Sequence, residues 1–262
     1  MFEVHSRASR IGLQLLATLM ILPFLAPLVF GVQGSLGGLG LGNYGKVWDT
    51  GIVPTVFINS AIIAFCTIAI VYVITMLAAY GFSKLRILGK EVWFWAILVA
   101  LIVPEAVILT PLFVVASNFD LYDEPIAVIL PLAALQVPFM ILIARNFFDG
   151  IPNQIIEAAR VDGASVAQVF RIIVLPLTRP MAAAIVVFTL IGSWNSYLLP
   201  MLMLTDRSKQ VVTLLPSFFT SQYTNDQTGV LAAAVITAVP VILVYLAFQR
   251  SFERGISAGA LK

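Results

Sequence analysis

Six long apolar runs constrain the fold of this chain more than any other feature of its sequence. Each is about as long as the roughly 20 residues that an α-helix needs to cross the hydrocarbon core of a bilayer. Of the 262 residues, 60% are hydrophobic and only 11% are charged, which is more apolar surface than a water-soluble fold could bury. The sequence therefore predicts an all-α integral membrane protein with six transmembrane helices, at about residues 11–31, 52–82, 91–116, 125–144, 181–204 and 229–249.

Lysine and arginine predict the orientation of these helices. With the N-terminus inside, 12 of them fall on the cytoplasmic side and 3 on the outer side, as the positive-inside rule requires. We therefore expect both termini, and the 36-residue gap at 145–180, to lie in the cytoplasm. Arg7 and Arg10 precede the first run, which is too long for a typical signal peptide and reads as an uncleaved span.

Several prolines fall inside the apolar runs. In a membrane helix, a proline leaves one backbone carbonyl without its usual partner and permits a kink. A purely structural role in shaping the helices is the favoured explanation for these prolines. A hinge or a cavity lining is the alternative. The positions are Pro23, Pro27, Pro104, Pro138, Pro200 and Pro240.

The residue inventory argues against enzyme chemistry. The chain has one cysteine, Cys66, and one histidine, His5, so a nucleophile–histidine pair and a zinc site of the usual ligands are close to excluded. We expect no catalytic residues and no metal site, and a membrane enzyme is an unfavoured rival. The net charge of +2 gives no indication of nucleic-acid binding.

One short stretch imitates a nucleotide site. GLGNYGK, at residues 40–46, fits the first seven positions of a phosphate-binding loop, but Val47 stands where serine or threonine should bind Mg²⁺. No strand is expected before it, and the orientation puts it outside the cell. We expect no cofactor on this chain, so any ATP and Mg²⁺ would belong to a partner.

The cytoplasmic gap contains an amphipathic segment at 151–176. Pro152 suits the first turn of a helix, Ile155 and Ile156 offer an apolar face, and Gly163 can end the helix in the left-handed conformation. A second helix of apolar periodicity follows and stops at Leu175-Pro176. The pattern predicts a helix–turn–helix, and the residues alone leave docking of another protein and packing on this chain equally open.

This segment carries a specific motif. The pattern EAA, three residues, Gly, nine residues, Ile, one residue, Leu-Pro resembles the signature of the permease subunits of bacterial ABC importers. The resemblance implies that the segment, between the fourth and fifth spans of a single permease domain at 1–262, is the coupling helix that contacts an ATP-hydrolysing subunit. The matching residues are Glu157, Ala158, Ala159, Gly163, Ile173, Leu175 and Pro176.

Shorter pieces resemble the maltose-type, carbohydrate-uptake branch of that family. They are AAYGFSKLRILGK at 78–90, Trp194-Asn195 followed by Pro200, and the terminal SAGALK. The resemblance implies a bacterial inner-membrane importer in which this chain is the smaller permease of a heterodimer. Its partners would be a second permease, an ATPase dimer and an extracytoplasmic solute-binding protein. The loop with Gln222, Tyr223, Asn225 and Asp226 would face that binding protein.

Polar residues inside the apolar runs are candidates for a substrate pathway, because polar groups are costly in a membrane. The group WNSY supplies aromatic faces and hydrogen-bonding groups, both of which suit a sugar, and Trp194 and Tyr197 are expected to share a helix face. Helix–helix hydrogen bonding is the alternative role. The candidates are Trp194, Asn195, Tyr197, Gln136 and Asn59, with Ser60 and Ser196 beside them.

Glu105 follows Pro104 inside the third run. A carboxylate within the membrane is a functional candidate by default, but no acid–base partner stands at a recognisable spacing, so a structural role is favoured. An ion-coupled secondary transporter that depends on Glu105 is the rival to the importer, and within the importer class a non-sugar solute is the alternative.

Overall fold

The structure is a computed structural model that describes residues 7–220 and 226–260, with side-chain surroundings described over 11–220 and 226–248. The chain divides into two compact units. One draws on residues 1–53 and 215–238, and the other on residues 54–214 and 239–262. The single permease domain expected over 1–262 stays a prediction. Gln222, Tyr223 and Asn225 lie outside the described residues, as does the end of SAGALK.

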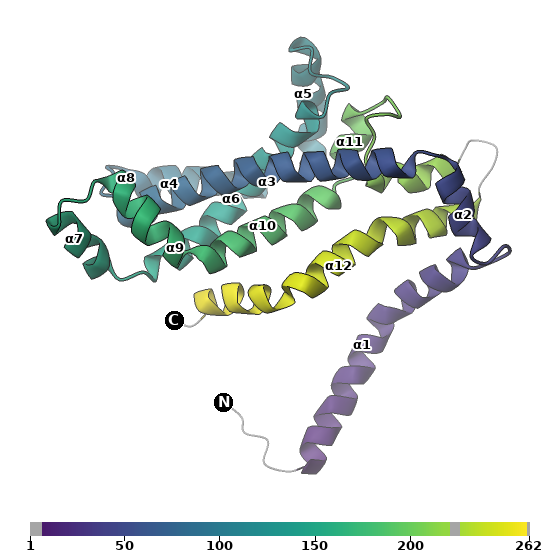
Figure 1. Cartoon of the computed structure of the whole chain (residues 1–262), viewed down its shortest axis with the longest axis horizontal. Helices are drawn as coiled ribbons and strands as arrows, with labels where there is room; N and C mark the ends of the chain where they lie inside the picture. Colours follow the sequence, from purple (N-terminus) through teal and green to yellow (C-terminus); the bar gives the residue numbers. More distant parts are fainter. Residues whose placement is uncertain (1–6, 221–225, 261–262) are drawn as a thin grey trace. The chain divides into compact units, whose positions relative to one another are not determined.

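Helices account for the regular structure of the described ranges (Figure 1). The first half of the chain forms α1 (Arg7–Ser35), α2 (Gly42–Asp49), α3 (Val53–Lys84), α4 (Lys90–Val99), the 3₁₀ turn η1 (Ala100–Ile102), α5 (Glu105–Asn118) and α6 (Ile126–Asp149). The second half forms α7 (Asn153–Val161), α8 (Val166–Gln168), the π-helical η2 (Val169–Val174), α9 (Leu175–Leu177), α10 (Arg179–Trp194), α11 (Leu198–Met203), the 3₁₀ helix η3 (Val212–Phe219) and α12 (Gln227–Ala260).

Within the ranges that the structure describes, four helices are long and apolar enough to cross a membrane alone: α1, α3, α6 and α12. They cover the first, second, fourth and sixth predicted spans. Two bent pairs raise the number to six if each pair counts as one span. The all-helical membrane fold predicted from the sequence is confirmed.

The third predicted span, 91–116, contains a sharp bend. The run from Lys90 to Ile102 and the helix α5 meet at an angle of 99°. Val103 and Pro104 are extended between them, with ψ angles of 115° and 140°. A proline disfavours the helical conformation of the residue before it and has no N–H to continue the ladder, so the chain turns here.

The fifth predicted span, 181–204, is interrupted between two helices. α10 ends at Trp194, and α11 begins at Leu198. At its other end, α10 forms a bent pair with the preceding helical stretch Val166–Leu177, at an angle of 75°. The chain also stays helical beyond Leu175-Pro176, where the sequence pattern placed a stop.

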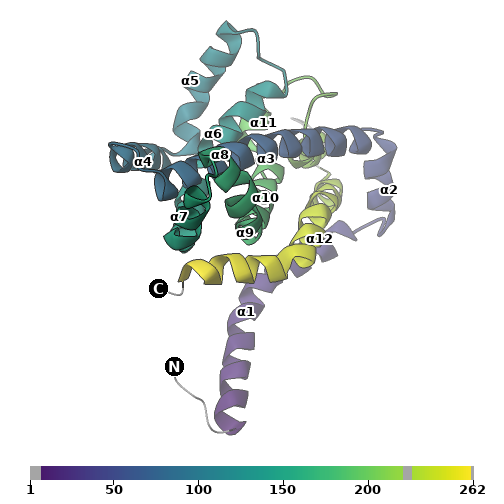
Figure 2. The same ribbon diagram turned by 60° about the vertical axis from the view of Figure 1, so that its left-hand side comes forward.

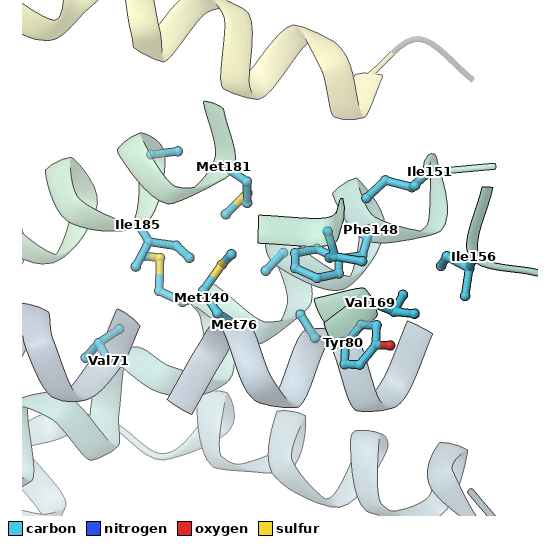
Figure 3. Close-up of a cluster of buried hydrophobic side chains, with 14 of the residues drawn as sticks. Val71, Met76, Tyr80, Met140, Phe148, Ile151, Ile156, Val169, Met181 and Ile185 are labelled. Carbon is cyan, nitrogen blue, oxygen red and sulfur yellow. The ribbon is translucent and has the colours of Figure 1, made fainter. Parts of the chain in front are cut away.

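The core of the second unit lies where α3, α6 and α10 run side by side (Figures 1 and 2). Figure 3 shows their buried side chains meeting those of the segment that follows α6. The labelled members are Val71, Met76 and Tyr80 from α3, Met140 and Phe148 from α6, Ile151, Ile156 and Val169, and Met181 and Ile185 from α10. The 151–177 segment is therefore built into the core at one end of these helices.

In the first unit, the stretch that imitates a phosphate-binding loop is helical. α2 begins at Gly42, inside the motif. The side chain of Asn43 is buried and donates hydrogen bonds to the carbonyls of Ser35 and Gly37, at 2.9 and 2.6 Å. The Asn43 amide therefore holds the turn between α1 and α2. Because α2 begins within the motif, the stretch does not form the glycine loop whose backbone N–H groups would bind a phosphate.

Candidate functional site

α7 starts where the sequence pattern places it. Pro152 is its extended N-cap, and Asn153 is its first residue. Lys84, at the end of α3, donates hydrogen bonds to the carbonyl of Ile151 at 2.6 Å and to Oδ1 of Asn153 at 3.0 Å. The entry to α7 is therefore tied directly to the C-terminal end of α3.

The two neighbouring isoleucines of α7 lie on different faces. Ile156 is 4% exposed and belongs to the core cluster, whereas Ile155 is 42% exposed. Glu157, Ala158 and Arg160 are exposed too. α7 thus buries one edge against its own chain and presents a face made of alanine, isoleucine and two charges.

The turn after α7 depends on Gly163. Its φ of +85° lies in the left-handed region, which glycine adopts without the steric cost that a Cβ brings. Ser165 then opens the next helical stretch with a capping box: its Oγ accepts from Gln168 N, and Gln168 Oε1 accepts from Ser165 N. The predicted left-handed turn at Gly163 is confirmed.

Three of the remaining motif residues are less exposed than Glu157 and Ala158. Ala159 and Leu175 are half-buried and pack against the core cluster, and Ile173 is half-buried. Pro176 is exposed in the first turn of α9. The motif therefore combines an exposed α7 face with side chains that seat the following helical stretch. Its coupling role stays a prediction.

Gln136 and the small residues of α10 form a polar pair between two helices. Gln136 Nε2 donates to Ser193 Oγ at 3.3 Å, and Ser193 is 7% exposed. A Cβ at Gly192 would come within 2.9 Å of Gln136 Oε1. Glycine at 192 thus makes room for the amide. Serine hydroxyls and glutamine amides commonly join helices in this way.

Trp194 and Tyr197 do not share a helix face, contrary to the sequence prediction. α10 ends at Trp194, Asn195 is its exposed C-cap, and Tyr197 precedes α11. The Trp194 ring packs edge-on against Phe57, with centroids 5.9 Å apart. It also lines an apolar cavity of about 50 Å³ with residues of α10 and the 240–244 stretch of α12.

Asn59 connects two distant parts of the chain. Its Nδ2 donates to the carbonyls of Ser208 and Gln210 at 2.8 and 2.9 Å. Ser60 accepts from Val212 N at 2.9 Å, and Thr213 donates to the carbonyl of Ser196 at 2.7 Å. The two Asn59 bonds use both donor hydrogens of its amide. Together with the Ser60 bond, they hold the 195–214 segment on α3.

Glu105 is the first residue of α5, directly after the bend at Pro104. Its Oε1 is buried, and no hydrogen-bond partner for it occurs among the described residues. A carboxylate at a helix N-terminus is favoured by the helix dipole, so this position is compatible with the structural role expected from the sequence.

Two contributors to the site were not predicted from the sequence. Lys84 was counted only as a cytoplasmic charge, yet it anchors α7. Ser193 was not singled out, yet it is the partner of Gln136. A small polar residue facing a glutamine in a neighbouring apolar run is the signal that could have pointed to this pair.

The comparison with known families assigns the chain to a protein family. Residues 34–258 match the family described as the inner membrane component of binding-protein-dependent transport systems. The match covers most of the sequence, and the chain belongs to this family. It is thus a membrane component of a transport system.

Relatives from several bacteria agree with this assignment. A diacetylchitobiose uptake system permease protein of Streptomyces coelicolor is 32% identical over 222 residues, which cover 84% of this chain and 74% of the relative. An sn-glycerol-3-phosphate transport system permease protein of Salmonella choleraesuis is 33% identical, with coverages of 82% and 79%. A lactose transport system permease protein of Rhizobium radiobacter is 34% identical, with coverages of 78% and 74%.

A solved structure shares the fold. It is a chain of a bacterial ABC transporter involved in the import of the acidic polysaccharide alginate, with a TM-score of 0.76 and 24% sequence identity. The match covers 95% of this chain and 99% of the other. The two chains thus share a fold over almost their whole lengths.

Proposed function

We propose that this chain is a membrane-spanning subunit of an ATP-driven ABC importer that moves a sugar or oligosaccharide into the cell by alternating access. One observation carries the proposal: the EAA residues that open the motif lie on a helix, α7, that exposes Glu157 and Ala158 while Ile156 and Lys84 attach it to the core. A helix held in this way can receive a force from outside and pass it on.

The structure suggests a path for that force. α7 contacts the core through Ile156, which shares a cluster with Phe148 of α6 and Tyr80 of α3 (Figure 3). The Lys84 bonds give a second link, to the end of α3. Because packed cores resist continuous deformation, a displacement of α7 would move α3 and α6 as rigid bodies.

The proposal assigns the remaining parts of the cycle to partners. ATP and Mg²⁺ would be bound by a dimer of ATPase subunits, one of which contacts α7. A second permease would complete the membrane pore, and an extracytoplasmic binding protein would deliver solute. Both termini and the 151–177 segment would lie in the cytoplasm, as the distribution of lysine and arginine favours.

Two relatives named for diacetylchitobiose and lactose support a sugar as the solute. The Gln136–Ser193 pair offers polar groups that could hydrogen-bond the hydroxyls of a sugar. Trp194, the next residue in the chain, offers an aromatic ring. Asn195 and Tyr197 are exposed at the break after α10. Asn59 is a weaker candidate, because its amide is already hydrogen-bonded to the chain. Glu105 is also weaker, because its position at the start of α5 suits a structural role.

A second candidate is a phosphorylated polyol, because another relative is named for sn-glycerol-3-phosphate transport. Uptake assays with radiolabelled disaccharides and with glycerol-3-phosphate distinguish the two solutes.

The proposed function is tested by purifying the chain from its native membrane under gentle extraction and identifying the associated proteins by mass spectrometry. We expect an ATPase subunit and a second permease. A chain that supports uptake under an ion gradient alone, with no ATPase associated, would contradict the proposal and favour the ion-coupled rival, which is then tested with Glu105→Gln.

A further inference from the structure

A basic cavity lies at the junction of α3, α4 and α7. It has a volume of about 340 Å³ and is lined by residues from the end of α3, the α3–α4 loop, the start of α4, and α7. That volume is at the lower end of the range of small-ligand sites. The lining residues are Ser83, Lys84, Leu85, Arg86, Lys90, Asn153, Ile156, Glu157 and Arg160.

The charge of this cavity is strongly positive. Lys84, Arg86, Lys90 and Arg160 face one carboxylate, that of Glu157, which leaves a formal excess of three positive charges. Two nearby carboxylates, those of Glu91 and Asp149, contact Arg145, and Glu91 also interacts electrostatically with Lys90. Glu91 receives two hydrogen bonds from Arg145, at 3.0 and 2.6 Å. Asp149 accepts from Ser83 at 2.6 Å and lies 3.9 Å from the same arginine.

Two of the four cations have roles within the chain. Lys84 binds the entry of α7, and Arg160 hydrogen-bonds the side chain of Tyr80. Arg86 is exposed, and the Lys90 contact is a long one of 3.4 Å to the carbonyl of Leu85. Arg86 and Lys90 are therefore the cations best placed to bind an external anion, and phosphate is one of the anions that arginine and lysine bind well.

The surface beside the cavity is apolar. Leu88 is 99% exposed, Val92 72% and Trp93 67%. All three lie in the α3–α4 loop and the first turn of α4, next to Arg86 and Lys90. Tryptophan beside lysine and arginine is typical of the headgroup level of a membrane. A ligand with a phosphate and acyl chains would satisfy both surfaces at once.

We propose that this cavity binds the headgroup phosphate of an anionic phospholipid from the cytoplasmic leaflet, with its acyl chains against Leu88, Val92 and Trp93. The inference rests on the proposed function for its orientation and for the role of α7. A phosphate held by Arg86 and Lys90 on one wall and Arg160 on the other would fasten α7 to the α3–α4 loop. The lipid would thereby stiffen the connection through which α7 moves the membrane helices.

The test uses the purified complex, with its ATPase subunits, in detergent. It is titrated with phosphatidylglycerol, with phosphatidylcholine and with inorganic phosphate, and bound lipid is counted by native mass spectrometry. We expect Arg86→Gln with Lys90→Gln to weaken phosphatidylglycerol binding roughly tenfold to thirtyfold, since each cation near a lipid surface contributes about a fivefold effect. Phosphatidylcholine should bind far more weakly to the unaltered complex.

A matched control removes the same charge elsewhere. Arg171 and Arg179 are exposed and belong to the same predicted cytoplasmic side, but they do not line the cavity. Arg171→Gln with Arg179→Gln should change binding less than about twofold. Arg86→Lys with Lys90→Arg, which keeps both charges, should retain binding and shows that loss in the glutamine variant does not come from misfolding.

Three results would overturn the inference. Equal loss in the cavity variant and the control would indicate a diffuse charge effect. Inorganic phosphate that competes as well as phosphatidylglycerol would indicate a soluble anion instead of a lipid. Binding that appears only after the ATPase is removed would show that the ATPase covers this cavity. The same spectra report whether an ATPase is present at all, so failure of the proposed function is read separately from failure of the lipid site.

Discussion

The 151–177 and 195–214 segments both interrupt the long helices of the second unit, but different bonds hold them in place. The first is shaped by neighbours in sequence: Pro152 starts α7, Gly163 turns the chain, and Ser165 and Gln168 cap the next stretch. The second is held by residues far away, since Asn59 bonds the carbonyls of Ser208 and Gln210. Local signals therefore shape the turns of the proposed coupling segment, which Lys84 attaches to α3, whereas tertiary bonds shape the other segment.

The largest expected effect concerns the attachment of α7. Ile156→Ala removes a buried side chain and should destabilise the docking of α7 by about 2–4 kcal/mol. Ile155→Ala is the matched control, because the same substitution at the neighbouring, exposed position should cost less than about 0.5 kcal/mol. Hydrogen exchange over residues 153–161 measures both. Equal loss of protection in the two variants would mean that α7 does not bury the face described.

The contrast between the segments explains what could be predicted from the sequence. Proline and glycine indicated the start of α7 and its turn correctly, because each acts within a few residues. The apolar face expected from Ile155 and Ile156 was wrong, since only Ile156 is buried. The bend at Pro104 was foreseen only as a permitted kink, since the sequence gives no angle. The break after Trp194 was missed, because a residue outside the local pattern, Thr213, bonds the Ser196 carbonyl where the chain leaves the helix.

A smaller effect is expected at the turn. Gly163→Ala should cost about 1–2 kcal/mol, because alanine tolerates the φ of +85° poorly even though its Cβ would meet no atom within 4 Å. Gly45→Ala, in α2, also has open space but no positive φ, so it should stabilise the protein by up to about 1 kcal/mol. Thermal unfolding of both variants tests this difference in sign. A neutral Gly163→Ala would show that the turn is not fixed by backbone conformation.

The Gln136–Ser193 pair should contribute less. A double-mutant cycle with Gln136→Leu and Ser193→Ala should give a coupling energy of about 0.6 kcal/mol, as is typical of hydrogen bonds between membrane helices. If sugar uptake falls more than about tenfold in Ser193→Ala while this coupling stays small, the pair acts on solute. Unchanged uptake would assign it to helix packing.

The smallest expected effect is on pH dependence in the 195–214 segment. The backbone and side chain of Ser208 donate to Asp206 and lower the pKa of its carboxyl. Because this pKa is below that of the unfolded chain, the bonds contribute stability above about pH 4, and the contribution is lost as the pH falls through the folded value. Asp206→Asn should remove that acid-side dependence, as measured by thermal unfolding between pH 3 and pH 7. An unchanged profile would show that these bonds do not stabilise the segment.

The central claim, that the exposed face of α7 contacts an ATPase subunit, can be tested by cross-linking. Because Cys66 is the chain's one cysteine, Cys66→Ser provides a background for a single thiol at Ala158→Cys or, as a control, at the exposed Thr205→Cys. With a short bifunctional reagent in native membranes, we predict a covalent product with an ATPase from Ala158→Cys and none from Thr205→Cys. No ATPase product from Ala158→Cys, in membranes that still support ATP-driven uptake, would contradict the assignment of this segment.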